Sequence, residues 1–374
     1  MKKRCICHIT TVHMVTDTRI LWRECASAAM KYHVVLIAPH DRQEQMAGVT
    51  IKPLRRYRRR PIRMTWGALR AFIAAWRTPA DIYHFHDPEL LPWMALLSIL
   101  RRKPVIYDVH EHVERFFFSK EYLRPFAAHL AQRVYGCLER LSFSRFAAIV
   151  AACPPVEKEL TAKYPANRTI ITVNNFPRTD KWDAVKRQFN SDSRDIIYVG
   201  RVCKERTLHN LVHAMSFVDG RLHLVGDYED ESYRQILRQT PGWEKVIEHG
   251  YLDRERVRKL MADCQTGVNV LPPTQNNLQS YPNKLFEYMA AGLPIVASNF
   301  PLWRQLIADN DCGVMVDPLS PESIAAGITR IFDDPQSARR MSEKGRKLAL
   351  ETYNWSREEA KLLALYARLL GDTS

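Results

Sequence analysis

Short apolar runs alternate with segments of helical periodicity along the whole chain. In the amino-terminal half, the runs that predict strands are residues 5–10, 34–38, 49–54, 82–85, 105–108 and 148–151. In the carboxy-terminal half they are residues 196–199, 222–225, 267–271, 295–297 and 313–316. Strands separated by helices form parallel sheets of βαβ units, so the pattern predicts two α/β domains with Rossmann-like sheets.

The helical segments and one polar stretch indicate where the domains end. Residues 123–142 predict an amphipathic helix, whose expected apolar stripe is Leu130, Val134, Leu138 and Leu141. A polar stretch makes residues 178–194 the best linker, and a last helix is expected at about residues 356–370. We therefore expect a first domain over 1–177, a second over 195–350 and a carboxy-terminal segment over 351–374.

Residues 281–298 predict a turn, a helix, a Gly-Leu-Pro break and a buried strand. Ser280 can cap this helix, and Pro282 suits its first turn. The free N–H groups and the dipole at a helix start suit a phosphate. Glu287, about one turn further on, can accept two hydrogen bonds from a diol. The spacing fits a nucleotide site, and it fits equally well an ordinary βαβ unit with a surface glutamate.

Two arginines follow the first strand of the second half. Ligands of open α/β sheets bind beyond the carboxyl ends of the strands, so Arg201 and Arg206 are placed to face such a ligand. The guanidinium group offers a rigid fork of donors for phosphate oxygens. The alternative for Arg201 is a surface ion pair.

The positive charge of the chain is confined to its first half. Residues 1–175 hold 28 Lys and Arg against 14 Asp and Glu, whereas the remainder holds 27 of each, which accounts for the net charge of +14. The densest cluster is Arg-Arg-Tyr-Arg-Arg-Arg at residues 55–60, with Arg63 just beyond. A domain with this excess of positive charge attracts anionic partners, such as anionic lipid, nucleic acid or an anionic glycan. The alternative is that the cluster is a solvated loop without a partner. Nucleic acid is disfavoured because Tyr57 is the cluster's only stacking aromatic.

Several functional classes are disfavoured. No G-x-G-x-x-G follows the first strand of either half, which argues against a nicotinamide or flavin enzyme. The eight cysteines show no metal-ligand spacing and suggest reduced thiols in a cytoplasmic protein. The amino terminus does not resemble a signal peptide, and the longest apolar run, residues 90–100, is too short to span a bilayer.

The segment Asn283-Lys-Leu-Phe-Glu-Tyr-Met-Ala-Ala-Gly-Leu-Pro294 resembles the donor-site signature of retaining glycosyltransferases of the GT-B fold, family 4 type. Further stretches that resemble this family are residues 9–13, 17–20, 81–91, 105–111, 196–201, 222–226 and 250–252. The resemblance implies two Rossmann-like domains that face each other across a cleft, with the last helix packed on the first domain. It also implies transfer of a sugar, with retention, from a UDP-sugar or GDP-sugar to a glycan or lipid-linked acceptor in surface polysaccharide or glycoconjugate synthesis.

The resemblance also assigns roles to individual residues. The diphosphate would be held by Arg201, Arg206 and the N–H groups of Asn283, Lys284 and Leu285. Glu287 would bind the ribose. His110 would contact the donor sugar, with Asp108 and Glu111 as its companions. Gln279 stands where the family has the first glutamate of an E-x7-E motif, and Thr207 where it has a glycine. His86 and Asp87 could line the acceptor side, or could simply pack at a strand end.

Some alternatives stay open. His84, His86, His110 and His112 could suggest a metal, but no helical H-E-x-x-H or Cys/His frame exists, so we expect no metal and no cofactor beyond the donor substrate. Phe116-Phe-Phe118 fits a core better than a lipid contact. We expect peripheral attachment to the inner face of the plasma membrane through the basic cluster. The rival functions are a nucleotide-sugar epimerase and, because of Gln279, a catalytically silent membrane-docked partner subunit.

Overall fold

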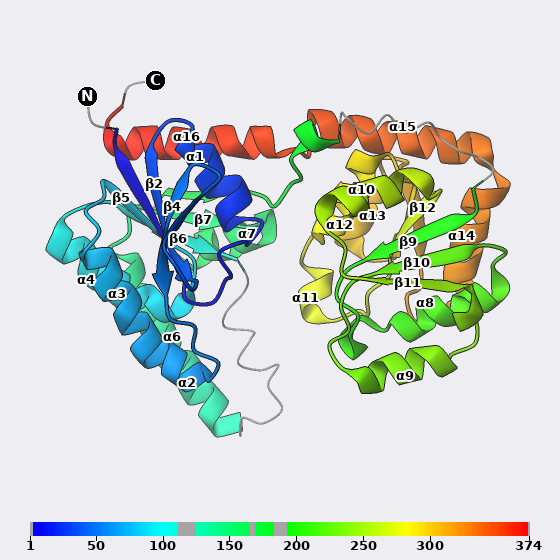
Figure 1. Cartoon of the computed structure of the whole chain (residues 1–374), viewed down its shortest axis with the longest axis horizontal. Coiled ribbons are helices and arrows are strands. Elements are labelled where there is room, and N and C mark those ends of the chain that lie inside the picture. Colours follow the sequence, from blue (N-terminus) through cyan, green and yellow to red (C-terminus); the bar gives the residue numbers. More distant parts are fainter. Residues whose placement is uncertain (1–2, 111–124, 165–168, 183–192, 373–374) are drawn as a thin grey trace. The chain divides into compact units, whose positions relative to one another are not determined.

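The computed structural model describes residues 3–110, 125–164, 169–182 and 193–372. It divides into two compact units, Met1–Asn175 with Arg357–Ser374, and Phe176–Ser356. Each unit is a mainly parallel β-sheet flanked by helices (Figure 1). This is the α/β architecture that the alternating pattern predicts, so the expected fold class is confirmed.

The first unit has an eight-stranded sheet in the order β3-β4-β2-β1-β5-β6-β7-β8, parallel except for the pair β3–β4. Its strands are β1 (Cys5–Ile9), β2 (His33–Pro39), β3 (Glu44–Met46), β4 (Val49–Leu54), β5 (Ile82–Phe85), β6 (Val105–Val109), β7 (Ala148–Ala151) and β8 (Thr169–Thr172). Its helices are α1 (Ala26–Ala29), α2 (Arg60–Ile62), α3 (Ala68–Trp76), α4 (Leu91–Arg101), α6 (Pro125–Phe143), α7 (Pro154–Lys163) and most of α16 (Trp355–Leu370). A π-helical turn over Ile20–Cys25 precedes α1, and another over Arg63–Gly67 joins α2 to α3.

The second unit has a six-stranded parallel sheet in the order β11-β10-β9-β12-β13-β14. Its strands are β9 (Asp195–Val199), β10 (Arg221–Val225), β11 (Val246–Gly250), β12 (Thr266–Asn269), β13 (Ile295–Ser298) and β14 (Gly313–Val316). Its helices are α8 (Leu208–Ala214), α9 (Glu231–Gln239), α10 (Arg254–Asp263), α11 (Gln275–Leu278), α12 (Asn283–Ala291), α13 (Pro301–Ile307), α14 (Pro321–Asp333) and α15 (Pro335–Glu351). The strand order reverses between β9 and β12, the point at which doubly wound sheets bind nucleotides.

The central strands are buried on both faces, as parallel strands covered by helices should be. Ile6, Val34 and Ile82 of the first unit have no exposed surface, nor do Ile196 and Ile295 of the second. Strands of this kind appear in the sequence as continuous apolar runs rather than alternating ones, which is why their positions could be predicted.

The predicted stripe of the helix now seen as α6 is wrong at Leu138 and Leu141, which are 41% and 70% exposed. Leu130 and Val134 lie outside the side chains that the structure describes, and the described buried positions of α6 are Tyr135, Glu139, Ser142 and Phe143. Glu139 is stabilised in the interior because it accepts hydrogen bonds from Tyr135 Oη (3.0 Å) and Tyr164 Oη (2.6 Å). Hydrophobic periodicity alone could not identify this buried face of α6, because a pattern of apolar residues treats a glutamate as an exposed position.

Candidate functional site

In the second unit, three groups from different segments meet around Gly200, directly after β9. A Cβ atom at Gly200 would lie 2.6 Å from Arg206 Nη1 and 3.1 Å from both Lys284 Cε and Tyr198 Oη. Only glycine therefore leaves room for this approach. Arg206 is held there because it donates a hydrogen bond to Tyr198 Oη (3.1 Å). Two cationic side chains thus lie beside the backbone of Gly200, which has no side chain to cover it, near the point where the strand order of the sheet reverses.

The start of α12 leaves backbone donors free next to these cations. Ser280 does not cap the helix as expected: Pro282 is the residue at the cap, and the Ser280 carbonyl accepts the Trp303 Nε1 hydrogen bond (2.8 Å). The Leu285 N–H donates to the Pro282 carbonyl (3.1 Å). Among the described residues, no acceptor is found for the N–H groups of Asn283 and Lys284. These two amides, at the positive end of the helix dipole, are the ones available to an anion.

Lys284 and Glu287 lie on the first turns of α12. Burial lowers the pKa of the Lys284 ammonium, and the charge of Glu287 partly opposes this shift. The Glu287 carboxylate is half-buried and has no hydrogen-bond or ion-pair partner in the described part of the chain. Lys284 was predicted only for its backbone amide, and its side chain next to Gly200 was missed because spacing does not show which way it points.

The remaining predicted donor residues are placed differently. The Arg201 side chain is 66% exposed and lies 3.7 Å from Glu229 Oε1, which is the surface ion pair considered as its alternative. Gln279 follows α11 as its C-cap residue. Thr207 adopts a left-handed conformation with φ of 49°, so the turn that a glycine favours is kept here at a conformational cost of roughly 1–2 kcal/mol.

In the first unit, the carboxyl ends of β5 and β6 bring His86, Asp108 and His110 together. Asp108 Oδ2 lies 3.1 Å from His86 Nδ1 and 3.0 Å from His110 Nε2. His86 and Asp108 are fully buried, whereas the His110 side chain is 19% exposed. The ring of His13, from the loop after β1, lies 4.7 Å from that of His110. His110 is thus the exposed end of a buried hydrogen-bonded chain.

Arg19 holds the buried end of this hydrogen-bonded network in place. Its Nε and Nη2 each donate a 2.8 Å hydrogen bond to Asp108, and its Nε also lies 2.9 Å from Glu24 Oε1. Burial opposes ionisation of Asp108, but Arg19 and His110 outweigh it and hold the pKa of this carboxyl well below its ordinary value. Burial and the charge of Asp108 raise the pKa of Glu24 well above its ordinary value. One guanidinium therefore faces two carboxyls whose pKa values are shifted in opposite directions.

Asp87 fixes the loop that follows β1. It is only 2% exposed and accepts hydrogen bonds from Thr10 Oγ1 (2.8 Å) and from the Thr11 amide (2.6 Å). His86 likewise has no exposed side chain. In this structure both residues therefore support neighbouring groups and do not themselves present a surface to an acceptor. Spacing could not reveal the role of Asp87, because its partners Thr10 and Thr11 lie more than seventy positions away.

A second histidine cluster lies deeper in the same unit. His8 and His84 contact Tyr366 of α16, with Tyr366 Oη 3.1 Å from His8 Nε2 and 2.7 Å from His84 Nδ1. Burial lowers the pKa of His8 and of His84, so both rings are neutral. Through these contacts of Tyr366, the helix α16 near the end of the chain packs against the first unit.

Ligand atoms of Glu24, His84, His86 and Asp108 lie within 4.8 Å of one another, a spacing that could suit a metal ion. The guanidinium of Arg19 already supplies positive charge to both carboxyls, so a divalent cation would be repelled there. The absence of a metal stays a prediction. Glu111, the other expected companion of His110, His112 of the histidine set considered for a metal, and the triplet Phe116–Phe118 lie outside the described residues.

Two family models match the chain. "Glycosyl transferases group 1" matches residues 180–348, and "Glycosyl transferase 4-like domain" matches residues 14–175. A phosphatidyl-myo-inositol mannosyltransferase of Mycolicibacterium smegmatis is 31% identical over 307 residues, covering 78% of this chain and 72% of the relative. The chain covers less than half of two other curated relatives, 39% and 45% of their lengths.

Solved structures share the fold. Sucrose-phosphate synthase from Thermosynechococcus elongatus superposes with a TM-score of 0.78 at 18% identity, covering 99% of this chain and 100% of that one. Anabaena Alr3699/HepE in complex with UDP gives a TM-score of 0.74 at 13% identity, covering 98% and 100%. Together with the matched families, these likenesses show that the chain belongs to the GT-B glycosyltransferases of family 4 type.

Proposed function

We propose that this glycosyltransferase moves a sugar from a UDP-sugar or GDP-sugar to a hydroxyl of a glycan or lipid-linked acceptor, with retention at the anomeric carbon. The observation that carries the proposal is the approach of the Arg206 and Lys284 side chains to Gly200, together with the free amides of Asn283 and Lys284 at the start of α12. A diphosphate is the group that such a set of cations and N–H donors suits. The solved complex of a protein with the same fold contains UDP.

The geometry suggests how the donor is held and how its diphosphate leaves. The Asn283 and Lys284 amides and the Arg206 guanidinium would bind phosphate oxygens, while Glu287 would accept two hydrogen bonds from the ribose diol. As the bond from the anomeric carbon to the diphosphate breaks, negative charge grows on the departing oxygen. Donors already in place stabilise that charge without reorganising, which is usually the largest contribution to catalysis.

For the first unit, we propose His110 as the group that orients the transferred sugar. Asp108 and Arg19 hold the His110 ring, and Asp87 fixes the neighbouring loop through Thr10 and Thr11. His86 and Asp87 would act on the acceptor side only through the groups that they position.

Replacing Glu287 by Ala is expected to weaken nucleoside diphosphate binding, because the ribose would lose a charged acceptor. Hydrogen bonds to charged groups contribute about 1.5–3 kcal/mol, which corresponds to roughly 10- to 150-fold in Kd. Calorimetry with UDP and GDP measures the change, and Glu255→Ala on the exposed face of α10 is the matched control. Equal affinities of the two variants would contradict the ribose assignment.

A membrane surface is the second part of the proposal. None of the described helices combines the length and apolar character needed to cross a bilayer. However, α2, α3 and the π-helical turn between them expose Ile62, Trp66, Ile73 and Trp76 by 38–63%. The basic cluster precedes this helical segment, and α4 adds Leu96, Ile99 and Leu100 to the exposed apolar residues. Apolar side chains beside arginines are typical of helices that lie in the interface of an anionic membrane.

Replacing Arg56, Arg58 and Arg59 by Ser is expected to release the protein from anionic vesicles. Each basic residue near such a surface contributes about 1 kcal/mol, so three together change the partition coefficient by roughly 100-fold. Arg63 is kept because it binds the buried Glu89. Arg254, Arg256 and Lys259, exposed on α10, give a control of equal charge. If wild type fails to sediment with anionic vesicles at low salt, the membrane role is wrong.

A further inference from the structure

A second histidine, His13, stands beside His110 at the carboxyl edge of the first sheet. The centroids of the two rings lie 4.7 Å apart, and the ring planes are inclined by 37°. His13 follows β1 and His110 follows β6, so two segments distant in sequence bring imidazoles to one place. Both side chains stay partly exposed, by 27% and 19%. A group that contacts His110 therefore comes within reach of His13.

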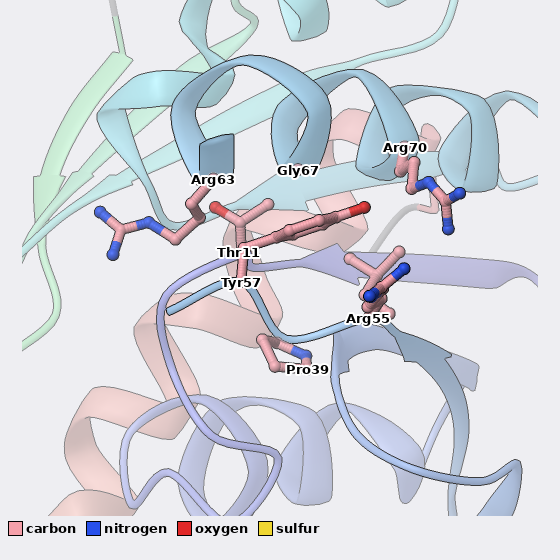
Figure 2. Close-up of a pocket in the computed structure, with 8 residues that line it drawn as sticks. Thr11, Pro39, Arg55, Tyr57, Arg63, Gly67 and Arg70 are labelled. Atoms are coloured by element: carbon pink, nitrogen blue, oxygen red, sulfur yellow. The ribbon is translucent and has the colours of Figure 1, made fainter. Parts of the chain in front are cut away.

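The loop that carries His13 has a fixed backbone. The His13 amide donates a hydrogen bond to Thr10 Oγ1 (3.0 Å). In the same loop, Thr11 Oγ1 donates to Glu89 Oε1 (2.7 Å), which also accepts from Arg63 Nε (2.9 Å). Figure 2 shows Thr11 beside Arg63. The loop therefore presents His13 in one defined position.

Each of the two rings is oriented by a carboxylate at one of its nitrogens. His13 Nδ1 lies 3.2 Å from Asp17 Oδ2, and His110 Nε2 lies 3.0 Å from Asp108 Oδ2. Asp17 is fixed in turn, because its Oδ1 accepts the backbone N–H of Ile20 (3.0 Å). A carboxylate on one nitrogen sets the orientation of an imidazole and thereby the direction of the other nitrogen.

The second nitrogen of each ring has no hydrogen-bond partner in the part of the chain that the structure describes. His13 Nε2 lies 3.7 Å from Asp87 Oδ1, which is beyond hydrogen-bond distance. Burial disfavours the charged form of His13, but Asp17, Asp87 and Asp108 outweigh it and raise the pKa of this ring. Because a protonated imidazole donates from both nitrogens, His13 Nε2 is a donor available to a ligand.

The charges around His13 favour hydroxyl groups over an anion. One imidazolium faces the two carboxylates Asp17 and Asp87, so no positive charge is left over for a phosphate or carboxylate ligand. A sugar hydroxyl both donates and accepts, so it suits a ring N–H that lies beside carboxylate oxygens. Two donors on adjacent rings match two neighbouring hydroxyls of one sugar better than they match a single group.

We propose that His13 is a second sugar-binding residue of the first unit, and that His13 and His110 together bind two neighbouring hydroxyls of the transferred sugar. The inference rests on the proposed function, in which His110 contacts that sugar. It deepens that function by naming a residue that selects donors by their hydroxyl pattern. A sugar that lacks the hydroxyl leaves the Nε2 donor unpaired, and sites built to bind a hydroxyl reject such analogues strongly.

The test is calorimetry on the full chain that compares a sugar nucleotide with the nucleoside diphosphate it contains. The probes are UDP-glucose, UDP-N-acetylglucosamine and GDP-mannose, each against UDP or GDP. His13→Ala is expected to weaken binding of the tightest sugar nucleotide by about tenfold or more. Binding of UDP and GDP should be unchanged, because the proposed site of the diphosphate and ribose lies in the second unit.

Two further variants serve as controls. His13→Gln should recover part of the lost affinity, because the glutamine amide nitrogen can take the place of Nε2 as a donor. His33→Ala removes an exposed histidine at the amino end of β2, on the opposite edge of the same sheet, and should change nothing. If His13→Ala melts at a lower temperature than wild type, His13→Gln takes its place in the comparison with His33→Ala.

Monodeoxy analogues of the tightest sugar nucleotide locate the contact. The analogue that lacks the hydroxyl bound by His13 should bind wild type and His13→Ala equally, so the two losses are not additive. Additive losses for every analogue would overturn the inference.

Failure of the inference differs from failure of the proposed function. If neither the nucleoside diphosphates nor the sugar nucleotides bind, the proposed function fails and the inference fails with it. If a sugar nucleotide binds and His13→Ala leaves its affinity unchanged, or weakens UDP or GDP by the same factor, the inference alone is overturned.

Discussion

Replacing Arg206 by Gln is expected to lower kcat by about 10²- to 10³-fold while reducing nucleoside diphosphate affinity much less. Arg206 Nη1 lies 2.6 Å from the position that a Cβ atom of Gly200 would take, and Lys284 Cε lies 3.1 Å from the same position. A donor at this point interacts more strongly with the departing diphosphate than with the bound donor, because charge grows as the bond breaks. Removing one such donor elsewhere costs a factor of this size.

Steady-state kinetics with the natural donor, combined with calorimetry, separates the two effects. Arg256→Gln removes an exposed arginine of α10 and should leave both quantities unchanged. A fall in affinity as large as the fall in kcat would mean that Arg206 binds the ground state only. An unchanged kcat would remove Arg206 from the proposed chemistry.

Replacing Asp108 by Asn is expected to destabilise the first unit by about 3–5 kcal/mol, whereas Glu24→Gln should not destabilise it at neutral pH. Asp108 is the ionised partner of the buried Arg19, and breaking such a pair leaves an uncompensated buried charge. Burial and the charge of Asp108 raise the pKa of Glu24, so its ionised form is disfavoured in the fold and glutamine removes no stabilising charge. Urea unfolding at pH 7 compares the two variants.

The lowered pKa of Asp108 also predicts how the stability of the fold changes with pH. Because the folded pKa of Asp108 lies below its unfolded value of about 4, this carboxylate stabilises the fold fully above that value. The contribution is lost as the pH falls from about 4 through the folded pKa, and Asp108→Asn should remove this part of the acid sensitivity. A larger loss of stability in Glu24→Gln than in Asp108→Asn would reverse the assignment of the charges.

The sequence predicted most strands because central parallel strands are continuous apolar runs. It missed β3 and β8, which lie at the two edges of the first sheet and are three and four residues long, and also β11, which lies at one edge of the second sheet. Thr169–Thr172 is half-buried and ends in threonines, so it lacks the run that marks a buried strand. The predicted stripe of α6 was wrong at Leu138 and Leu141 for a related reason, since Glu139 is buried by partners that are distant in sequence.

The two parts of the candidate site differed in how far they could be predicted. Lys284 and Glu287 stand within one helix, so a local motif placed them correctly relative to each other. Arg19 and Asp108 are 89 positions apart, and His8 and Tyr366 are 358 apart. Such contacts depend on strand order, which spacing does not reveal. The buried network around His110 could therefore not be predicted beyond its strand-end histidines.

The central claim is retaining transfer from a nucleoside diphosphate sugar, and proton NMR of the reaction tests it most directly. Wild-type protein would be incubated with a panel of UDP-sugars and GDP-sugars and with glycan or lipid-linked acceptors. We predict release of nucleoside diphosphate that depends on the acceptor, with a new glycosidic linkage of the same anomeric configuration as the donor. Inverted configuration would contradict retention, and a folded chain that neither binds nor cleaves any donor of the panel would contradict the account as a whole.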